Sequence, residues 1–372
     1  MKFSLPPECG PAAHSDFGLL HRGDDFGSRL CGFSQRPYAL SMKLQLAELR
    51  LPAPRGIRLV ALSFLDDASE AAGRLQTSRG ADDLHDFRVA VRRLRSWIRA
   101  FNEELRDLKK ADLDRLKALA ASTGAGRDLE VQLEWLSSAG KGLSIRRRRG
   151  AGWLSNHLQS RNAESGDTIK QTLAEKFDPA RDALARRLST FRQPVRTPAA
   201  PAMTLKEVIG YRLVTQSEQL GEALGHVRSP ADEQLSHQAR IMAKRLRYLL
   251  EPAASNVRGG DAAVTKLRSL QDSLGAVHDL HVMAHIIREM LDTSAAREAR
   301  SASRSILPQV AGEDEAVAAL AVPRADVVAV ARRLNDDIEK HFSPVRDGWI
   351  DGHYEKFGEE IAVIARRLRA RR

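Results

Sequence analysis

Basic side chains recur at one-turn intervals between Leu84 and Phe101, where the sequence reads LHDFRVAVRRLRSWIRAF. In an α-helix, at about 100° per residue, five of them share roughly a quarter of the circumference: His85, Arg88, Arg92, Arg95 and Arg99. The apolar residues of the same stretch fall on the opposite side, with the helical period that enters a core. The basic face contains no acid, although like charges one turn apart destabilise a helix. The segment therefore predicts a helix that packs through one face and binds an anion through the other.

The second half of the chain repeats this basic segment. Residues 237–251, HQARIMAKRLRYLLE, align with HDFRVAVRRLRSWIR and again carry cations at the same positions: His237, Arg240, Lys244 and Arg247. Arg93 aligns with Arg245, and after a one-residue gap Lys117 aligns with Arg268. Self-similarity of this length predicts two structural copies. We expect them to pack about a pseudo-twofold axis and to present their cations to one shared channel.

Two differences between the aligned copies change the charge of the predicted site. Glu251 stands where Arg99 stands in the first copy, so the second row of cations ends in an acid and should be the weaker one. His278 stands at the position of Arg127, so the charge it contributes depends on pH.

The twin H-x-x-R-x-x-x-[RK]-R-L-R helices, each followed about forty residues later by a G-x-x-[RH]-D segment, resemble the CHAD family, the conserved histidine α-helical domain. The resemblance covers roughly residues 57–372. It implies an all-α fold of two four-helix repeats around a basic central channel. It also implies binding of inorganic polyphosphate, often at polyphosphate granules. The positions that it marks for phosphate binding are His85, Arg88, Arg92 and Arg95 in the first copy, and His237, Arg240, Lys244 and Arg247 in the second.

The spacing of these cations suits a phosphate chain. A helix rise of about 1.5 Å per residue separates cations three or four positions apart by roughly 5–6 Å. Arginine offers a planar fork of donors to phosphate oxygens and keeps its charge. We therefore add the aligned or adjacent cations Arg99, Lys117 and Arg268 to the predicted phosphate-binding residues.

The chain divides into an arm and a helical domain. Residues 1–41 are rich in Gly, Pro and Ser without a sustained period, which predicts a disordered or loosely packed arm. Residues 42–372 form the predicted CHAD-like domain, with repeat one over about 57–192 and repeat two over about 203–372. Between them lies a linker, about 193–202, whose three prolines block a helix.

Helical patterning is expected to continue through Leu119, with a break near 122–126 and a Gly-punctuated stretch over 137–152. In the second half we expect breaks near Pro230, at Gly259–Gly260 and near 308–313. No alternating strand pattern of convincing length is present.

The composition favours an anionic partner. The 372 residues include 59 Lys plus Arg against 48 Asp plus Glu, which gives a formal charge of +11 and fits nucleic acid, polyphosphate or other polyanions. Cys9 and Cys31 form neither a disulfide framework nor a CxxC metal pair. Neither a transmembrane helix nor a signal peptide is expected, so we predict a cytoplasmic protein, associated with polyphosphate granules.

Other functions fit these residues less well. A basic helical protein that binds nucleic acid is the main alternative, but the basic rows lack the interleaved aromatic residues that stack on bases. A phosphatase or kinase would need carboxylates to hold Mg²⁺ opposite the cations, and none is visible, so we expect no enzyme activity and no cofactor. His278, His281 and His285 have a spacing compatible with a metal site. The first copy lacks matching histidines, so we expect no metal.

Overall fold

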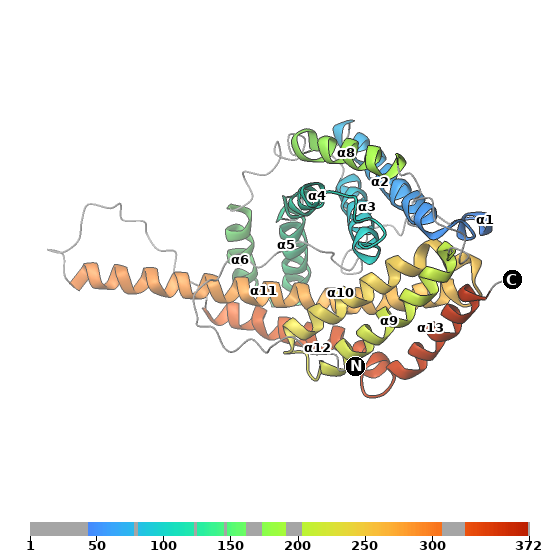
Figure 1. Cartoon of the computed structure of the whole chain (residues 1–372). Coiled ribbons are helices and arrows are strands. Elements are labelled where there is room, and N and C mark those ends of the chain that lie inside the picture. The colour runs from blue at the N-terminus through green and yellow to red at the C-terminus, as the bar shows by residue number, and fades with distance from the viewer. Residues whose placement is uncertain are drawn as a thin grey trace, which may run out of the picture.

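The computed structural model describes residues 44–77, 81–122, 125–144, 147–160, 173–190, 203–306 and 324–370. Within these ranges the protein is all-α, as expected, with no strand and one isolated bridge between Pro52 and Thr204 (Figure 1). Its first helices are α1 (Leu46–Leu49), α2 (Ala53–Thr77), α3 (Ala81–Ala100), α4 (Lys110–Ser122), α5 (Ala125–Lys141), α6 (Arg148–Ser160), the π-helical turn η1 (Leu173–Phe177) and α8 (Asp178–Ser189). They are followed by α9 (Leu205–His226), α10 (Glu233–Leu250), the 3-10 helix η2 (Glu251–Asn256), α11 (Gly260–Ile306), α12 (Arg324–Trp349) and α13 (Tyr354–Arg369).

Several helix boundaries fall where the sequence predicts them. A break separates α4 from α5 near residues 122–126, and another separates α9 from α10 around Pro230. The break at Gly259–Gly260 is also confirmed, because Gly259 has a φ of +93°, a left-handed conformation that favours glycine. The predicted arm, residues 1–41, and the predicted linker, 193–202, lie outside the described residues, as does 308–313.

The helix expected to continue through Leu119 is interrupted. After α3 ends at Ala100, residues 101–109 form turns, and α4 begins at Lys110. Three apolar residues of this turn are buried in the core, namely Phe101, Leu105 and Leu108. Their spacing of four and three residues imitates the helical period, which explains why the pattern predicted a helix here.

The stretch 137–152 is largely helical, contrary to the expectation of a Gly-punctuated segment. α5 continues to Lys141, and α6 already begins at Arg148. Gly150 lies inside α6 at a close approach to α12, because a Cβ there would come within 2.6 Å of the Asp326 carbonyl carbon. This glycine therefore serves helix packing and does not end a helix.

Helices from both halves of the chain bury their apolar faces together. The largest core joins α2, α3 and α8 to α9, α10, α11 and α13. A second core joins α5 and α6 to α11 and α12, and a third lies among α2, α3, α4 and η1. In the first half α2 packs against α3 and α8, and in the second α9 packs against α10 and α13. The pseudo-twofold axis and the repeat boundaries themselves stay predictions.

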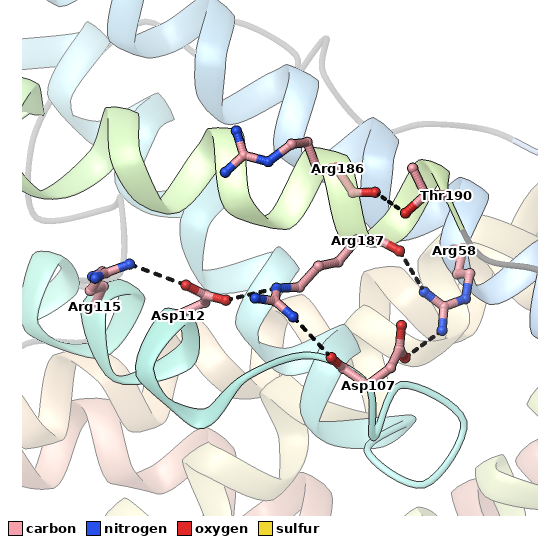
Figure 2. Close-up of polar contacts among 7 residues, drawn as sticks. All are labelled: Arg58, Asp107, Asp112, Arg115, Arg186, Arg187 and Thr190. Atoms are coloured by element: carbon pink, nitrogen blue, oxygen red, sulfur yellow. Dashed lines mark hydrogen bonds and ion pairs between the residues drawn. The ribbon is translucent and has the colours of Figure 1, made fainter.

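A polar cluster holds α8 against the turn that follows α3 (Figure 2). The Arg58 guanidinium, buried on α2, donates to the Asp107 carboxylate at 2.5 Å and to the Arg187 carbonyl at 3.2 Å. Arg187 in turn forms an ion pair with Asp112 at 3.2 Å, and Arg115 contacts the same carboxylate. These contacts fix the place of the turn and hence the C-terminal end of α3.

None of the helices in the described ranges combines the length and the apolar character needed to cross a lipid bilayer.

Candidate anion-binding site

Two helices that pack against each other, α3 and α10, carry most of the predicted site residues. The apolar face of α3 is buried as expected, with Leu94 0% exposed, and Leu246 at the aligned position of α10 is also 0% exposed. On the same helix the indole Nε1 of Trp97 donates to the Ile57 carbonyl at 2.9 Å, which fixes the rotation of α3 against α2. The basic faces of α3 and α10 are therefore held in place by the core.

The cations of α10 are more deeply buried than a solvated helix face. Arg240 is 1% exposed and Lys244 is 6% exposed. All three guanidinium nitrogens of Arg240 are buried and have no hydrogen-bond partner among the described residues. A buried cation without such partners is unfavourable, because the protein does not replace the water it loses. The geometry at Arg240 thus favours an anion from outside the chain.

His278 joins this cationic cluster from α11. Its ring lies 4.7 Å from that of His237, measured between centroids. The pKa of His278 is lowered to about 2, mainly by burial and also by the positive charges of Arg240 and Lys244 and by two neighbouring histidines. Since its pKa lies so far below neutrality, His278 is uncharged here at physiological pH. The expected pH-dependent charge at this position is therefore suppressed by its surroundings.

The predicted site residues of the first half differ in solvent exposure, from buried to exposed. Arg92 on α3 is 8% exposed. His85, Arg88 and Arg95 are partly buried, whereas Arg99 at the C-terminal end of α3 is exposed. Lys117 is exposed on α4, which packs against α3. The side chain of Arg127 lies outside the described parts of the chain.

Glu251 is the centre of a buried ion-pair cluster. Its carboxylate, 5% exposed, lies 3.3 Å from Arg93 of α3 and 3.4 Å from Arg247 of α10. Arg268 of α11 contacts it at 3.9 Å. Glu251 therefore does more than weaken the second row of cations, because it links α3 to α10 and α11. This role of Arg93 does not follow from the sequence pattern, although the Arg-Leu-Arg motif shared by both copies places an arginine there.

The three histidines of α11 have different partners. His285 Nε2 lies 2.7 Å from the Glu233 carboxylate, whereas the Pro230 carbonyl accepts a hydrogen bond from His281. His278 lies against His237. In the portions of the chain that the structure covers, no group of three or more His, Cys, Asp or Glu side chains is placed to hold a metal ion.

Comparison with known proteins identifies the family. The model of the CHAD domain matches residues 63–288, more than half of the chain. The chain belongs to the CHAD domain family. The match spans α3, α10 and the part of α11 that carries His278. All eight positions that the resemblance marked for phosphate binding therefore lie inside the CHAD domain.

Solved structures support the CHAD fold. The crystal structure of the CHAD domain from the plant Ricinus communis matches with a TM-score of 0.55 at 16% identity, and the match covers 86% of this chain and 94% of that one. PptA from Streptomyces chartreusis matches with a TM-score of 0.52 at 17% identity, covering 80% of this chain and 99% of that one. At such identities the likeness is one of fold. A comparison with curated protein sequences gives no match.

Proposed function

We propose that this CHAD protein binds inorganic polyphosphate without turning it over. The observation that carries the proposal is the buried guanidinium of Arg240, which has no hydrogen-bond partner among the described residues. Lys244 is close enough that both charges act on His278. An anion bound here would supply the missing hydrogen bonds and relieve the repulsion between the two cations.

A flexible phosphate chain fits the distribution of these cations better than a compact anion. Cations along each helix are roughly 5–6 Å apart, so successive phosphates can contact successive side chains. The proposed phosphate-binding residues are His85, Arg88, Arg92, Arg95, Arg99, Lys117, His237, Arg240, Lys244, Arg247 and Arg268. We propose that they line a basic channel and that binding serves to target, scaffold or store polyphosphate at cytoplasmic granules. Other polyanions would compete for the same cations.

The surroundings of Glu251 favour binding over catalysis. Metal-assisted phosphoryl chemistry needs carboxylates that are available to a divalent ion. Glu251 is instead surrounded by three arginines. The proposal therefore assigns no catalytic residue and no cofactor.

Nucleic acid is the alternative ligand. Tyr248, the aromatic residue of the α10 motif, is 1% exposed and lies beneath the Arg247 guanidinium, whose carbon is 4.7 Å from the ring centroid. A buried ring cannot stack on a base, which is the interaction that single-strand binders use. If long-chain polyphosphate fails to displace bound RNA or DNA, nucleic acid replaces polyphosphate as the proposed ligand.

A calorimetric titration with polyphosphate at two ionic strengths tests the proposed function. We expect a steep loss of affinity with salt, because each phosphate that the protein neutralises releases counterions. The Lys244→Gln variant should bind about tenfold more weakly, since it removes a buried charge from the site.

Lys266→Gln is the matched control for this variant. Lys266 lies on α11, where it forms a half-exposed ion pair with Glu360 at 2.7 Å. Its loss removes one positive charge and should change affinity less than about twofold. Equal losses in the two variants would mean that net charge, and no defined site, governs binding. Release of orthophosphate in the presence of Mg²⁺ or Mn²⁺ would contradict the non-enzymatic role.

A further inference from the structure

Two neutral polar side chains are buried where α10 packs against α11. Gln271 of α11 is 5% exposed and Tyr248 of α10 is 1% exposed. Both amide atoms of Gln271, Oε1 and Nε2, and the hydroxyl of Tyr248 have no hydrogen-bond partner in the part of the chain that the structure describes. Buried polar groups in folded proteins are nearly always hydrogen-bonded, because an unpaired group loses its water without compensation. An outside ligand could therefore complete the hydrogen bonds of these atoms.

Two contacts fix how α10 and α11 lie against each other. The rings of His237 and His278 lie 4.7 Å apart between centroids. At the other end Glu251, the C-cap of α10, lies 3.9 Å from Arg268 of α11. From the first contact to the second, residue numbers rise along α10 and fall along α11, so the two helices run antiparallel.

Helix spacing then places Gln271 opposite Lys244 and Tyr248. Gln271 precedes His278 by seven residues, which puts it on the same face of α11, two turns or about 10 Å along the helix. Lys244 follows His237 by seven residues and Tyr248 follows it by eleven, so all three share one face of α10 to within about 20°. Counted from the histidine contact, Lys244 and Gln271 lie two turns along in the same direction.

We propose that the Gln271 amide and the Tyr248 hydroxyl donate hydrogen bonds to a phosphate group that is bound beside Lys244. The subsite rests on the proposed function and assigns two neutral residues, which no charge pattern marks, to the ligand contacts. Gln271 Nε2 and the Tyr248 hydroxyl can both donate, and hydrogen bonds to a phosphate oxygen are charge-assisted. The Lys244 ammonium has three donors, enough for Gln271 Oε1 and for the phosphate. Neutral donors add contacts without adding to the repulsion among the cations.

The charged groups around this subsite suit an anion. The carboxylate of Glu251 lies one turn from Tyr248, but three arginines surround it and leave the cluster with a net positive charge: Arg93, Arg247 and Arg268. The Arg268 side chain is 42% exposed. Since Arg268 also lies one turn from the buried amide on α11, this end of the interface borders on solvent and a phosphate chain can enter there.

Calorimetric titration of the full-length chain with inorganic tripolyphosphate at two ionic strengths tests the subsite. Tyr248→Phe removes the hydroxyl alone, and Gln271→Leu replaces the amide with an apolar side chain of similar size. We expect each to lower affinity about tenfold, the effect of one charge-assisted hydrogen bond. Neither variant changes a charge, so the slope of log affinity against log salt should keep its wild-type value, whereas Lys244→Gln should lower it by about one. Without ligand both variants should melt no lower than the wild type, because the groups removed have no partner there.

Tyr211→Phe and Gln219→Leu are the matched controls. They make the same two changes at exposed positions of α9 and should bind within about twofold of the wild type. If Tyr248→Phe and Gln271→Leu bind as tightly as these controls while Lys244→Gln binds weakly, the proposed function stands and the subsite is wrong. A free Tyr248→Phe variant that melts below the wild type, or a lower salt slope in it, would also overturn the subsite. Absence of any binding to the wild type overturns both proposals.

Discussion

At the residue scale, His278 couples the proposed ligand to protons. Cations around it and its burial lower its pKa to about 2. A bound polyphosphate would cancel the repulsion from Arg240 and Lys244, so the pKa of His278 should rise on binding. Because the complex then holds more protons than the free protein at pH values between the two pKa values of His278, affinity should increase as the pH falls below about 5. Calorimetry in two buffers of different ionisation enthalpy would measure the proton uptake.

Two variants separate His278 from the general effect of pH on charge. His278→Gln should reduce the proton uptake, since glutamine does not titrate. His226→Gln, at an exposed histidine near the end of α9, should leave the uptake unchanged. Proton uptake that is identical in all three proteins would contradict the coupling.

Asp67, a partly buried carboxyl on α2, makes a second pH-dependent contribution. Its Oδ2 has no hydrogen-bond partner among the described residues. Its pKa is raised from 3.8 to about 6, mainly by burial, with Arg93 opposing the shift and Glu70 and Asp66 adding to it. With a raised pKa the folded protein favours the protonated form. Ionisation of Asp67 therefore lowers the free energy of unfolding as the pH rises through 6.

Asp67→Asn should remove this effect. We expect the variant to be about 1–2 kcal/mol more stable than the wild type at pH 8, with the difference vanishing toward pH 4. Urea denaturation of both proteins across this range measures it, and Asp114→Asn, at an exposed position of α4, serves as the control. A variant less stable than the wild type at pH 8 would mean that the attraction between Asp67 and Arg93 outweighs the burial of the carboxylate.

At the scale of elements, the Glu251 cluster joins three helices through one carboxylate. Glu251→Gln would remove the carboxylate that lies 3.3 Å from Arg93, which is 4% exposed. Removal of one partner of a buried pair typically lowers the free energy of unfolding by about 3 kcal/mol or more. The matched variant Glu360→Gln disrupts the half-exposed pair with Lys266 and should lower it by less than about 1 kcal/mol. Chemical denaturation of the wild type and the two variants measures these changes in the free energy of unfolding.

Helix periodicity predicted the elements well where local pattern and packing agree. The apolar stripe and the basic face of α3, and their repetition in α10, follow from residue spacing alone. The turn at 101–109 could not be predicted in this way. Its residues Phe101, Leu105 and Leu108 are buried and have helical spacing, although the segment forms no helix. The sequence predicts a Gly-punctuated stretch over 137–152, whereas Gly150 lies inside α6, where α12 approaches closely. That contact belongs to tertiary structure, which local patterns do not encode.

The candidate site shows the same limit. The residue types and their alignment predicted the candidate phosphate-binding side chains. These side chains differ in their burial in the structure, since Arg240 is 1% exposed whereas Arg99 lies at the surface. The pairing of Arg93 with Glu251 depends on the packing of α3 against α10. A sequence predicts the charge of such a residue, but not which oppositely charged group from another helix it meets.

At the scale of the whole molecule, helices from both halves of the chain share buried cores. Trp135 of α5 donates through Nε1 to the Asp337 carboxylate of α12 at 3.2 Å. In the same core Leu154 of α6 is buried together with Leu280 of α11 and Val330 of α12. The largest core also mixes helices from both halves. Each half would therefore expose an extensive apolar surface if it were separated from the other.

This shared packing predicts how a cleaved chain behaves. A protease site inserted within 193–202 should allow cleavage into two fragments that stay associated, because the cores hold them together without the connecting peptide. Each purified fragment alone should lack a cooperative unfolding transition, and mixing the two should restore it. Size-exclusion chromatography and thermal unfolding followed by circular dichroism measure both effects. A first-half fragment that folds alone with a cooperative transition would show that the core shared by α5, α6, α11 and α12 is dispensable for the stability of repeat one.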